Sequence, residues 1–128
     1  MTAILFAAYL AADEQPLLVH STAIDYPYFA HTTGVQGTVK FELSIDQSGA
    51  VGSVKHVSGP AMLAAPTAGI LKTWSFSRCT SGDCLFPLTI RFVLEGGPLY
   101  AQQCTTKVSF DGPNLVTVQT EHTRPYIN

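Results

Sequence analysis

The strongest constraint on the fold comes from residues 37–59, where apolar and polar residues alternate through the first half of the segment. A period of two is typical of a strand that buries one face. Asp46-Gln47-Ser48-Gly49 then provides a turn, because Asp can hydrogen-bond to its own backbone and Gly can adopt positive φ. The pattern predicts a β-hairpin whose second strand covers about residues 51–58, with a bulge near Gly52 or a change of face. The apolar positions of the first strand are Val39, Phe41, Leu43 and Ile45.

A hairpin is not stable alone in water, so the rest of the chain must cover its apolar face. The 128 residues are enough for one domain with a substantial core. Charged residues make up only 12% of the chain, the formal net charge is −2, and the 7 Lys and Arg residues are scattered. This composition argues against a nucleic-acid-binding surface.

The longest apolar run lies at the start of the chain, over residues 3–12. The run is too short to span a bilayer and resembles the hydrophobic part of a secretory signal. We therefore expect residues 1–12 to form a signal segment that is cleaved near Ala12, and the protein to be periplasmic or secreted. The alternative is that the run forms a first strand or helix of the fold.

The three cysteines fit an exported protein better than a metal site. Cys79 and Cys84 enclose the turn-forming stretch Thr-Ser-Gly-Asp. A disulfide between them would close a short loop and contribute about 2 kcal/mol. The alternative is a pair of free, buried thiols. Cys104 then remains, either as a packed thiol or as a site of intermolecular pairing.

The residues before the hairpin predict an extended lead-in and a short helical turn. Residues 13–25 form the lead-in, in which Leu17-Leu18-Val19 either adds a short strand or packs across the core. The helical turn opens at Tyr26-Pro27, since proline suits the first position of a helix. Gly34 can end this turn in a left-handed conformation.

Between residues 59 and 76 the apolar period becomes helical. Pro66 is expected in the first turn of this helix. Because the helix is weak by propensity, packing of its apolar stripe must stabilise it. The stripe consists of Leu63, Ile70, Leu71 and Trp74.

A second strand and a second hairpin follow the helix. Pro87 cannot donate a hydrogen bond, which places it at the edge of a sheet or at the beginning of the strand. Residues 105–110 and 115–121 alternate around the turn signal of residues 111–114, which predicts the hairpin. One face of the strand carries Phe86, Leu88, Ile90, Phe92 and Leu94.

Together these segments predict an α+β fold. We expect an antiparallel sheet, made of the hairpin plus an edge strand, packed against one main helix and a short N-terminal helical turn, with an extra C-terminal hairpin. The expected division of the chain is a signal segment (1–12), an extended lead-in (13–25), the main domain (26–97), and the extra C-terminal hairpin and tail (98–128).

No pattern of residues predicts catalysis, a metal site or a cofactor. The chain has no serine nucleophile elbow and no glycine-rich phosphate loop. Glu42 and Asp46 lie on one strand face and are expected to be solvated, which falls short of a paired acid and base. The histidines have no ligand spacing and are expected on the surface or on strand faces: His20, His31, His56 and His122. We predict that the protein is not an enzyme.

Over residues 26–95 the order of elements and several short motifs resemble one family, the C-terminal domain of TonB-type energy transducers. The matching motifs are Tyr26-Pro27-Tyr28-Phe29-Ala30, Gly34-Val35-Gln36-Gly37-Thr38-Val39, Asp46-Gln47-Ser48-Gly49-Ala50-Val51, Ser58-Gly59, and Trp74-Ser75-Phe76.

The resemblance implies a binding module of the cell envelope. In that family a three-stranded antiparallel sheet carries helices on one face, and its last strand offers an open edge to an extended segment of an outer-membrane receptor, linked to energy-dependent transport. Such strand addition takes affinity from backbone hydrogen bonds and selectivity from alternate side chains. Carried over to this sequence, the edge consists of Leu88, Thr89, Ile90, Arg91, Phe92 and Val93.

The sequence also departs from the family. It carries no membrane-anchoring helix and no Pro-rich spacer, Ile24-Asp25 replaces the Gln-Pro of some members, and Ser75 stands where many members carry Arg. The hairpin after Gly97 is extra and can pair with the edge that a partner would use. The alternative hypothesis is therefore a closed structural or assembly domain whose sheet edge is capped by residues 105–121, with dimer formation through Cys104 as one route to assembly.

Overall fold

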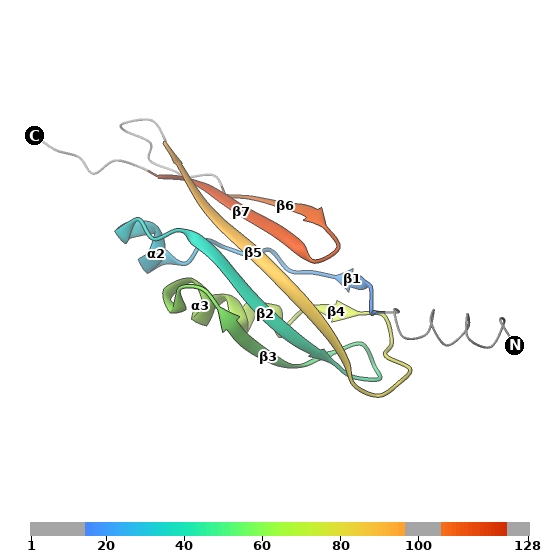
Figure 1. Cartoon of the computed structure of the whole chain (residues 1–128). Helices are drawn as coiled ribbons and strands as arrows, with labels where there is room; N and C mark the ends of the chain where they lie inside the picture. Colours follow the sequence, from blue (N-terminus) through green and yellow to red (C-terminus); the bar gives the residue numbers. More distant parts are fainter. Residues whose placement is uncertain (1–14, 97–105, 123–128) are drawn as a thin grey trace, which may run out of the picture.

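The computed structural model describes residues 15–96 and 106–122, and within these ranges it contains two helices, a five-stranded sheet and a two-stranded sheet (Figure 1). None of the helices in these ranges is long and apolar enough to cross a membrane. The elements in chain order are β1 (Leu18–His20), α2 (Tyr28–Thr33), β2 (Gly37–Ile45), β3 (Val51–Ser58), α3 (Ala61–Leu71), β4 (Ser75–Phe76), β5 (Cys84–Gly96), β6 (Thr106–Gly112) and β7 (Leu115–His122).

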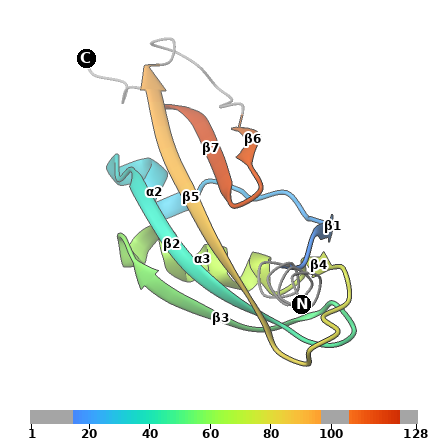
Figure 2. The ribbon, with the colours of Figure 1, turned by 45° about the vertical axis from the view of Figure 1, so that its right-hand side comes forward.

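The larger sheet has the strand order β3-β2-β5-β7-β6, with the long strand β5 in the middle. The helices lie on one face of this sheet (Figure 2). Neighbouring strands are antiparallel except β5 and β7, which are parallel. The parallel pair arises because the second strand of the C-terminal hairpin, and not the first, docks on β5. The predicted α+β class is confirmed, with its main helix, its first hairpin and its C-terminal hairpin.

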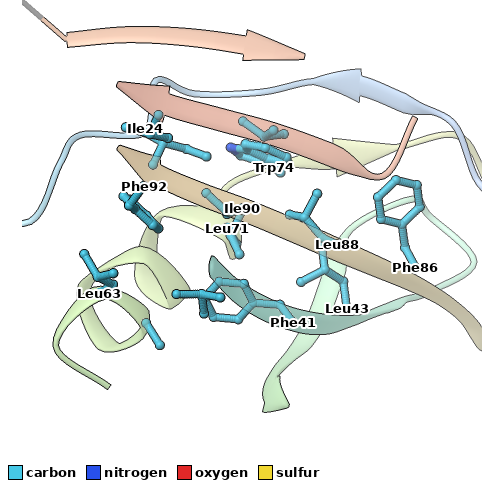
Figure 3. Packing of buried hydrophobic residues seen from close by; sticks show 14 of the residues in the cluster. Ile24, Phe41, Leu43, Leu63, Leu71, Trp74, Phe86, Leu88, Ile90 and Phe92 are labelled. Atoms are coloured by element: carbon cyan, nitrogen blue, oxygen red, sulfur yellow. The ribbon is translucent and has the colours of Figure 1, made fainter. Parts of the chain in front are cut away.

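The core lies between the sheet and the helices and is built from alternate residues of β2 and β5 (Figure 3). The four apolar positions predicted for β2 are all buried, and so are the first four predicted for β5. Leu94 is only partly buried at the end of that face. Each fully buried side chain contributes roughly 1.5–3 kcal/mol, so a one-residue slip in register would cost far more than it could recover.

The first hairpin turn is held by the Asp46 side chain, as predicted. Its Oδ1 accepts hydrogen bonds from Ser48 N (2.9 Å), Ser48 Oγ (2.6 Å) and Ala50 N (3.0 Å). Gly49 adopts a φ of 90° in this turn. The register then moves from Ser44↔Ser53 to Ile45↔Val51, which places the predicted bulge at Gly52.

These hydrogen bonds to the charged carboxylate, with the Ser48 side chain first among them, lower the pKa of Asp46. A carboxyl whose folded pKa lies below its unfolded value of about 3.9 stabilises the fold above that value and loses the effect as pH falls through the folded pKa. Asp46→Asn should therefore be less stable than the wild type at neutral pH, and the difference should shrink in acid. Urea unfolding of both proteins over a pH series measures this, and a difference that is constant with pH would contradict the assignment.

The main helix begins and packs differently from the prediction. Pro60 is its N-cap, so Pro66 is the sixth residue and lies in the second turn, not in the first. Because proline has no N–H group, Pro66 cannot donate the helical hydrogen bond to the carbonyl of Met62. Met62 is exposed, so water can donate to this carbonyl instead. Ile70 is only partly buried, and the buried stripe includes the small residues Ala64 and Thr67 instead.

The lead-in forms the predicted short strand, β1, which pairs with β4. Pro27 is the N-cap of α2, one position before the predicted one, and Gly34 ends the helix with a left-handed φ of 76°. Tyr26 packs edge-to-face on Phe92 of β5, and its hydroxyl donates to Val35 O. Burial raises the pKa of Tyr26 to about 12.

Candidate functional site

The structure places residues 88–93 in the middle of the larger sheet, with neighbours on both sides. β2 pairs with β5 on one side as far as Phe92, and β7 pairs with β5 on the other side from Thr89↔Leu115 to Gly96↔His122. The open edge that the family resemblance implied is therefore absent from the described structure, and the edge is capped by the C-terminal hairpin, as the alternative hypothesis predicted. The physical reason is that the C-terminal hairpin has its own apolar face, which is buried when β7 docks on β5.

The side chains of this segment alternate as the sequence indicated. Leu88, Ile90 and Phe92 point into the core, where they pack with residues of α3 and the lead-in (Figure 3). Thr89, Arg91 and Val93 lie on the opposite face, which is polar. A partner strand on this edge would therefore contact two chemically different faces.

The hairpin contributes to the core and does not merely lie on the surface. Val116 and Val118 of β7 are 1% and 0% exposed, and Thr120 is 2% exposed on the same face. The ring of Phe110 in β6 lies 6.2 Å from that of Trp74. Burying two valines is worth several kcal/mol in total, which is a large fraction of the stability of a domain of this size.

Asn114 fastens the start of β7 to β5. Its Nδ2 donates to Pro87 O (2.6 Å), its backbone oxygen accepts from Thr89 N (2.8 Å), and its Oδ1 accepts from Gln15 Nε2 (3.1 Å). Pro87 lies two residues before Thr89, so its backbone nitrogen faces the same side of β5 as that of Thr89. The pairing with β7 begins only at Thr89, so no residue of β7 lies opposite Pro87. Its missing donor therefore breaks no bond of the ladder, in agreement with the predicted position of proline.

Asn114→Ala removes both side-chain hydrogen bonds while keeping the backbone bond to Thr89. We expect a loss of about 1–2 kcal/mol in the free energy of unfolding, together with faster amide exchange at residues 89–91. Denaturant unfolding and hydrogen exchange measure the two effects. Gln47→Ala, an exposed amide in the other hairpin turn, is the control and should change stability by less than about 0.5 kcal/mol. Equal effects of the two substitutions would contradict the role of Asn114.

A second set of contacts crosses the polar face from β5 to β6. Arg91 Nε donates to Thr117 Oγ1 (3.3 Å), and the Thr117 hydroxyl donates to the Asp111 carboxylate. At the other end of the hairpin, His31 Nε2 donates to Glu121 O (2.9 Å). Arg91, predicted to contact a partner, is thus engaged by the chain's own hairpin.

Cys79 and Cys84 form a disulfide, as predicted. Cys84 is the first residue of β5 and pairs with Ile45 of β2, so the closed loop leads directly into the central strand. The Ser81 hydroxyl lies 3.6 Å from Cys79 Sγ and 3.4 Å from Cys84 Sγ. The predictions for the signal segment and for Cys104 concern residues outside the described ranges.

His31 and His56 make separate structural contacts, and the described histidine side chains do not gather at one site. His56 Nε2 donates to Gly59 O (2.9 Å), His20 is exposed in β1, and His31 contacts the hairpin. In residues 15–96 and 106–122 no cluster of three or more His, Cys, Asp or Glu side chains could hold a metal ion. The polar contacts that the sequence did not predict include those of Asn114, which was expected only to form part of a turn, and those of Thr117.

Comparison with protein families matches residues 22–94 to the C-terminal domain of the Gram-negative bacterial TonB protein. The match covers more than half of the chain and ends within β5, so that β6 and β7 lie outside it. Comparison with curated proteins and with solved structures gave no match.

Proposed function

Because this chain belongs to the TonB C-terminal domain family of Gram-negative bacteria, we propose that it is a protein-interaction module of the cell envelope that binds an extended peptide by strand addition. The partner strand would take the edge of β5 formed by residues 88–93. A segment of an outer-membrane TonB-dependent receptor is the partner class that the family suggests, and energy-dependent transport is the process. The module itself carries out no chemistry.

The observation that carries the proposal is the pairing of β7 with β5 over eight residues. An edge that accepts an extended strand from its own chain has the backbone groups and the side-chain pockets to accept one from a partner. In this proposal the hairpin occupies the binding edge until a partner replaces β7. The apparent affinity of the partner is then reduced by the fraction of molecules in which the edge is open.

The alternative is a closed structural or assembly domain in which the hairpin never leaves β5. The complete burial of Val118 favours this alternative, because hairpin release would expose an apolar face. The two functions differ in one respect that can be measured, namely whether partner binding requires the hairpin to move.

A reversible lock tests this requirement. Val93 and Gln119 are register partners on β5 and β7, so Val93→Cys with Gln119→Cys can join the two strands by a disulfide. Cys104→Ser in the same chain removes the remaining unpaired thiol. Binding of synthetic receptor segments is measured by fluorescence anisotropy, for the oxidised and the reduced variant and for the Cys104→Ser protein under both conditions.

We expect the oxidised lock to weaken binding by about tenfold or more and reduction to restore it, while the control protein binds equally well in both conditions. Equal binding by the locked and unlocked variants would show that the β5 edge is not the site. Absence of binding to all forms, including the loosened Asn114→Ala variant, would favour the closed domain.

A further inference from the structure

Strand β6 is the outermost strand of the larger sheet on the C-terminal side (Figures 1 and 2). Within the described residues, no strand pairs with its outer side. All of its residues from Thr106 to Asp111 are exposed except Val108, which is half-buried. An exposed strand edge of this kind is a template for pairing with another chain.

The opposite edge of the sheet, β3, is less suited to pairing. The register of β3 against β2 shifts twice, once near each end, and such bulges bend an edge away from a regular ladder. In β6 the register is regular from Thr106 to Phe110, and the single shift comes after Phe110. Regular backbone groups are thus available along most of β6.

The sequence of β6 is complementary to itself when two copies run antiparallel with Ser109 at the centre. Lys107 then lies opposite Asp111 of the other copy, and Val108 lies opposite Phe110. Each pair occurs twice because the twofold axis repeats it. Both the charge pair and the apolar pair are of the kind that stabilises neighbouring strands.

The faces of these residues agree with this pairing. Val108 and Phe110 pair with Val118 and Val116 of β7, which point into the core. Lys107 and Ser109 alternate with them and lie on the polar face, where Asp111 accepts the hydrogen bond from Thr117. The two partners of each pair would therefore meet on the same side of the extended sheet.

Phe110 gives the apolar pair a further reason to form. Its side chain is 52% exposed although its ring lies against Trp74. In the antiparallel arrangement Val108 of the second copy lies directly opposite and would cover part of this exposed surface.

We infer that β6 is the contact through which two copies of this chain associate, antiparallel and with the twofold axis at Ser109, so that the larger sheet continues across the dimer. The contact uses a different strand from the proposed peptide-binding edge, but β6 belongs to the hairpin that a partner at β5 would displace. A contact along seven residues is small compared with a standard interface of roughly 1,600 Å². The dimer is therefore expected to form at high protein concentration and to weaken with salt.

Sedimentation of the full chain over a concentration series tests the inference. We expect the mass to rise from 13.7 kDa toward twice that value. Lys107→Asp places like charges opposite each other at two positions and should raise the dissociation constant by about tenfold. Lys55→Asp, the same change on the β3 edge, is the control and should have little effect. A chain that stays monomeric throughout, or a dimer that is equally sensitive to both substitutions, would overturn the inference.

A cross-linking measurement does not depend on charge. Ser109→Cys in the Cys104→Ser background places two thiols next to each other at the twofold axis, while Ser53→Cys places one on exposed β3. Mild oxidation should link the Ser109→Cys chains into dimers much faster than the Ser53→Cys chains. Equal rates would exclude Ser109 as the centre of the contact.

Discussion

Gly49→Ala is expected to destabilise the fold by about 3–5 kcal/mol, because it combines backbone strain with a direct overlap. The φ of Gly49 is 90°, a value that residues with a Cβ rarely adopt. A Cβ at this position would lie 2.0 Å from Phe76 O. Phe76 N donates to Gly49 O (2.7 Å), so the turn and β4 cannot separate without losing this bond. Denaturant unfolding of the variant measures the loss.

Gly69→Ala provides a matched control of opposite sign. Gly69 is an exposed residue inside α3, and a Cβ built there meets no atom within 4 Å. The same substitution should therefore stabilise the protein by about 0.5–1 kcal/mol, since alanine loses less backbone entropy in a helix. If both alanine variants lost stability to the same extent, the close approach of Gly49 to β4 would not be the cause.

The first hairpin and β5 could be predicted from the sequence because their information is local. Strict alternation at Val39, Phe41, Leu43 and Ile45 fixes which face is buried, and burial fixes the register. The turn at Asp46 is likewise determined by residues close in the chain. Predictions from such patterns succeed when each local choice agrees with the packing around it.

The neighbour of β5 could be predicted only as one of two alternatives, an edge left open for a partner or an edge capped by residues 105–121. The alternation of residues in the C-terminal hairpin shows that β7 has an apolar face. The same pattern would be expected for a strand that docks on any other sheet edge, so it does not identify β5 as the neighbour. Docking on β5 is decided by contacts between residues far apart in the chain, such as Asn114 with Pro87 and Thr117 with Arg91. The helix position of Pro66 was missed for a related reason, since its cost is tolerated at an exposed site.

The candidate site on β5 therefore stays a prediction, and the structure shows only that this strand has a neighbour on each side. Arg91 belongs to the edge that the family resemblance implies, and its side chain is exposed on the face opposite the core. Its neighbours are Thr117 and, through Thr117, Asp111 of the hairpin. Any partner strand at β5 must replace these contacts. The free energy needed to release the hairpin from β5 therefore separates the peptide-binding hypothesis from the closed-domain hypothesis.

Val118→Asp is expected to have the largest effect on this stability. Val118 is 0% exposed. Its partners on the two neighbouring strands are both apolar, Phe92 in β5 and Val108 in β6. An unpaired carboxylate at such a position costs about 3–5 kcal/mol. Burial raises the pKa of a carboxyl group, so the folded state binds its proton more tightly than the unfolded state. The loss should consequently shrink as the pH falls toward about 4.

Hydrogen exchange in the Val118→Asp variant then shows whether the C-terminal hairpin can leave β5 or is an integral part of the fold. If the hairpin can leave β5, the amides of residues 106–122 and the alternate amides of β5 that face β7 should lose protection, while the amides that join β2 to β5 and to β3 keep theirs. Gln119→Asp, on the polar face of the same strand, is the control and should leave all these amides protected. Loss of protection in β2 and β5 together would mean that the sheet unfolds as one unit. That result would contradict strand exchange at β5 and leave the closed domain as the function to pursue.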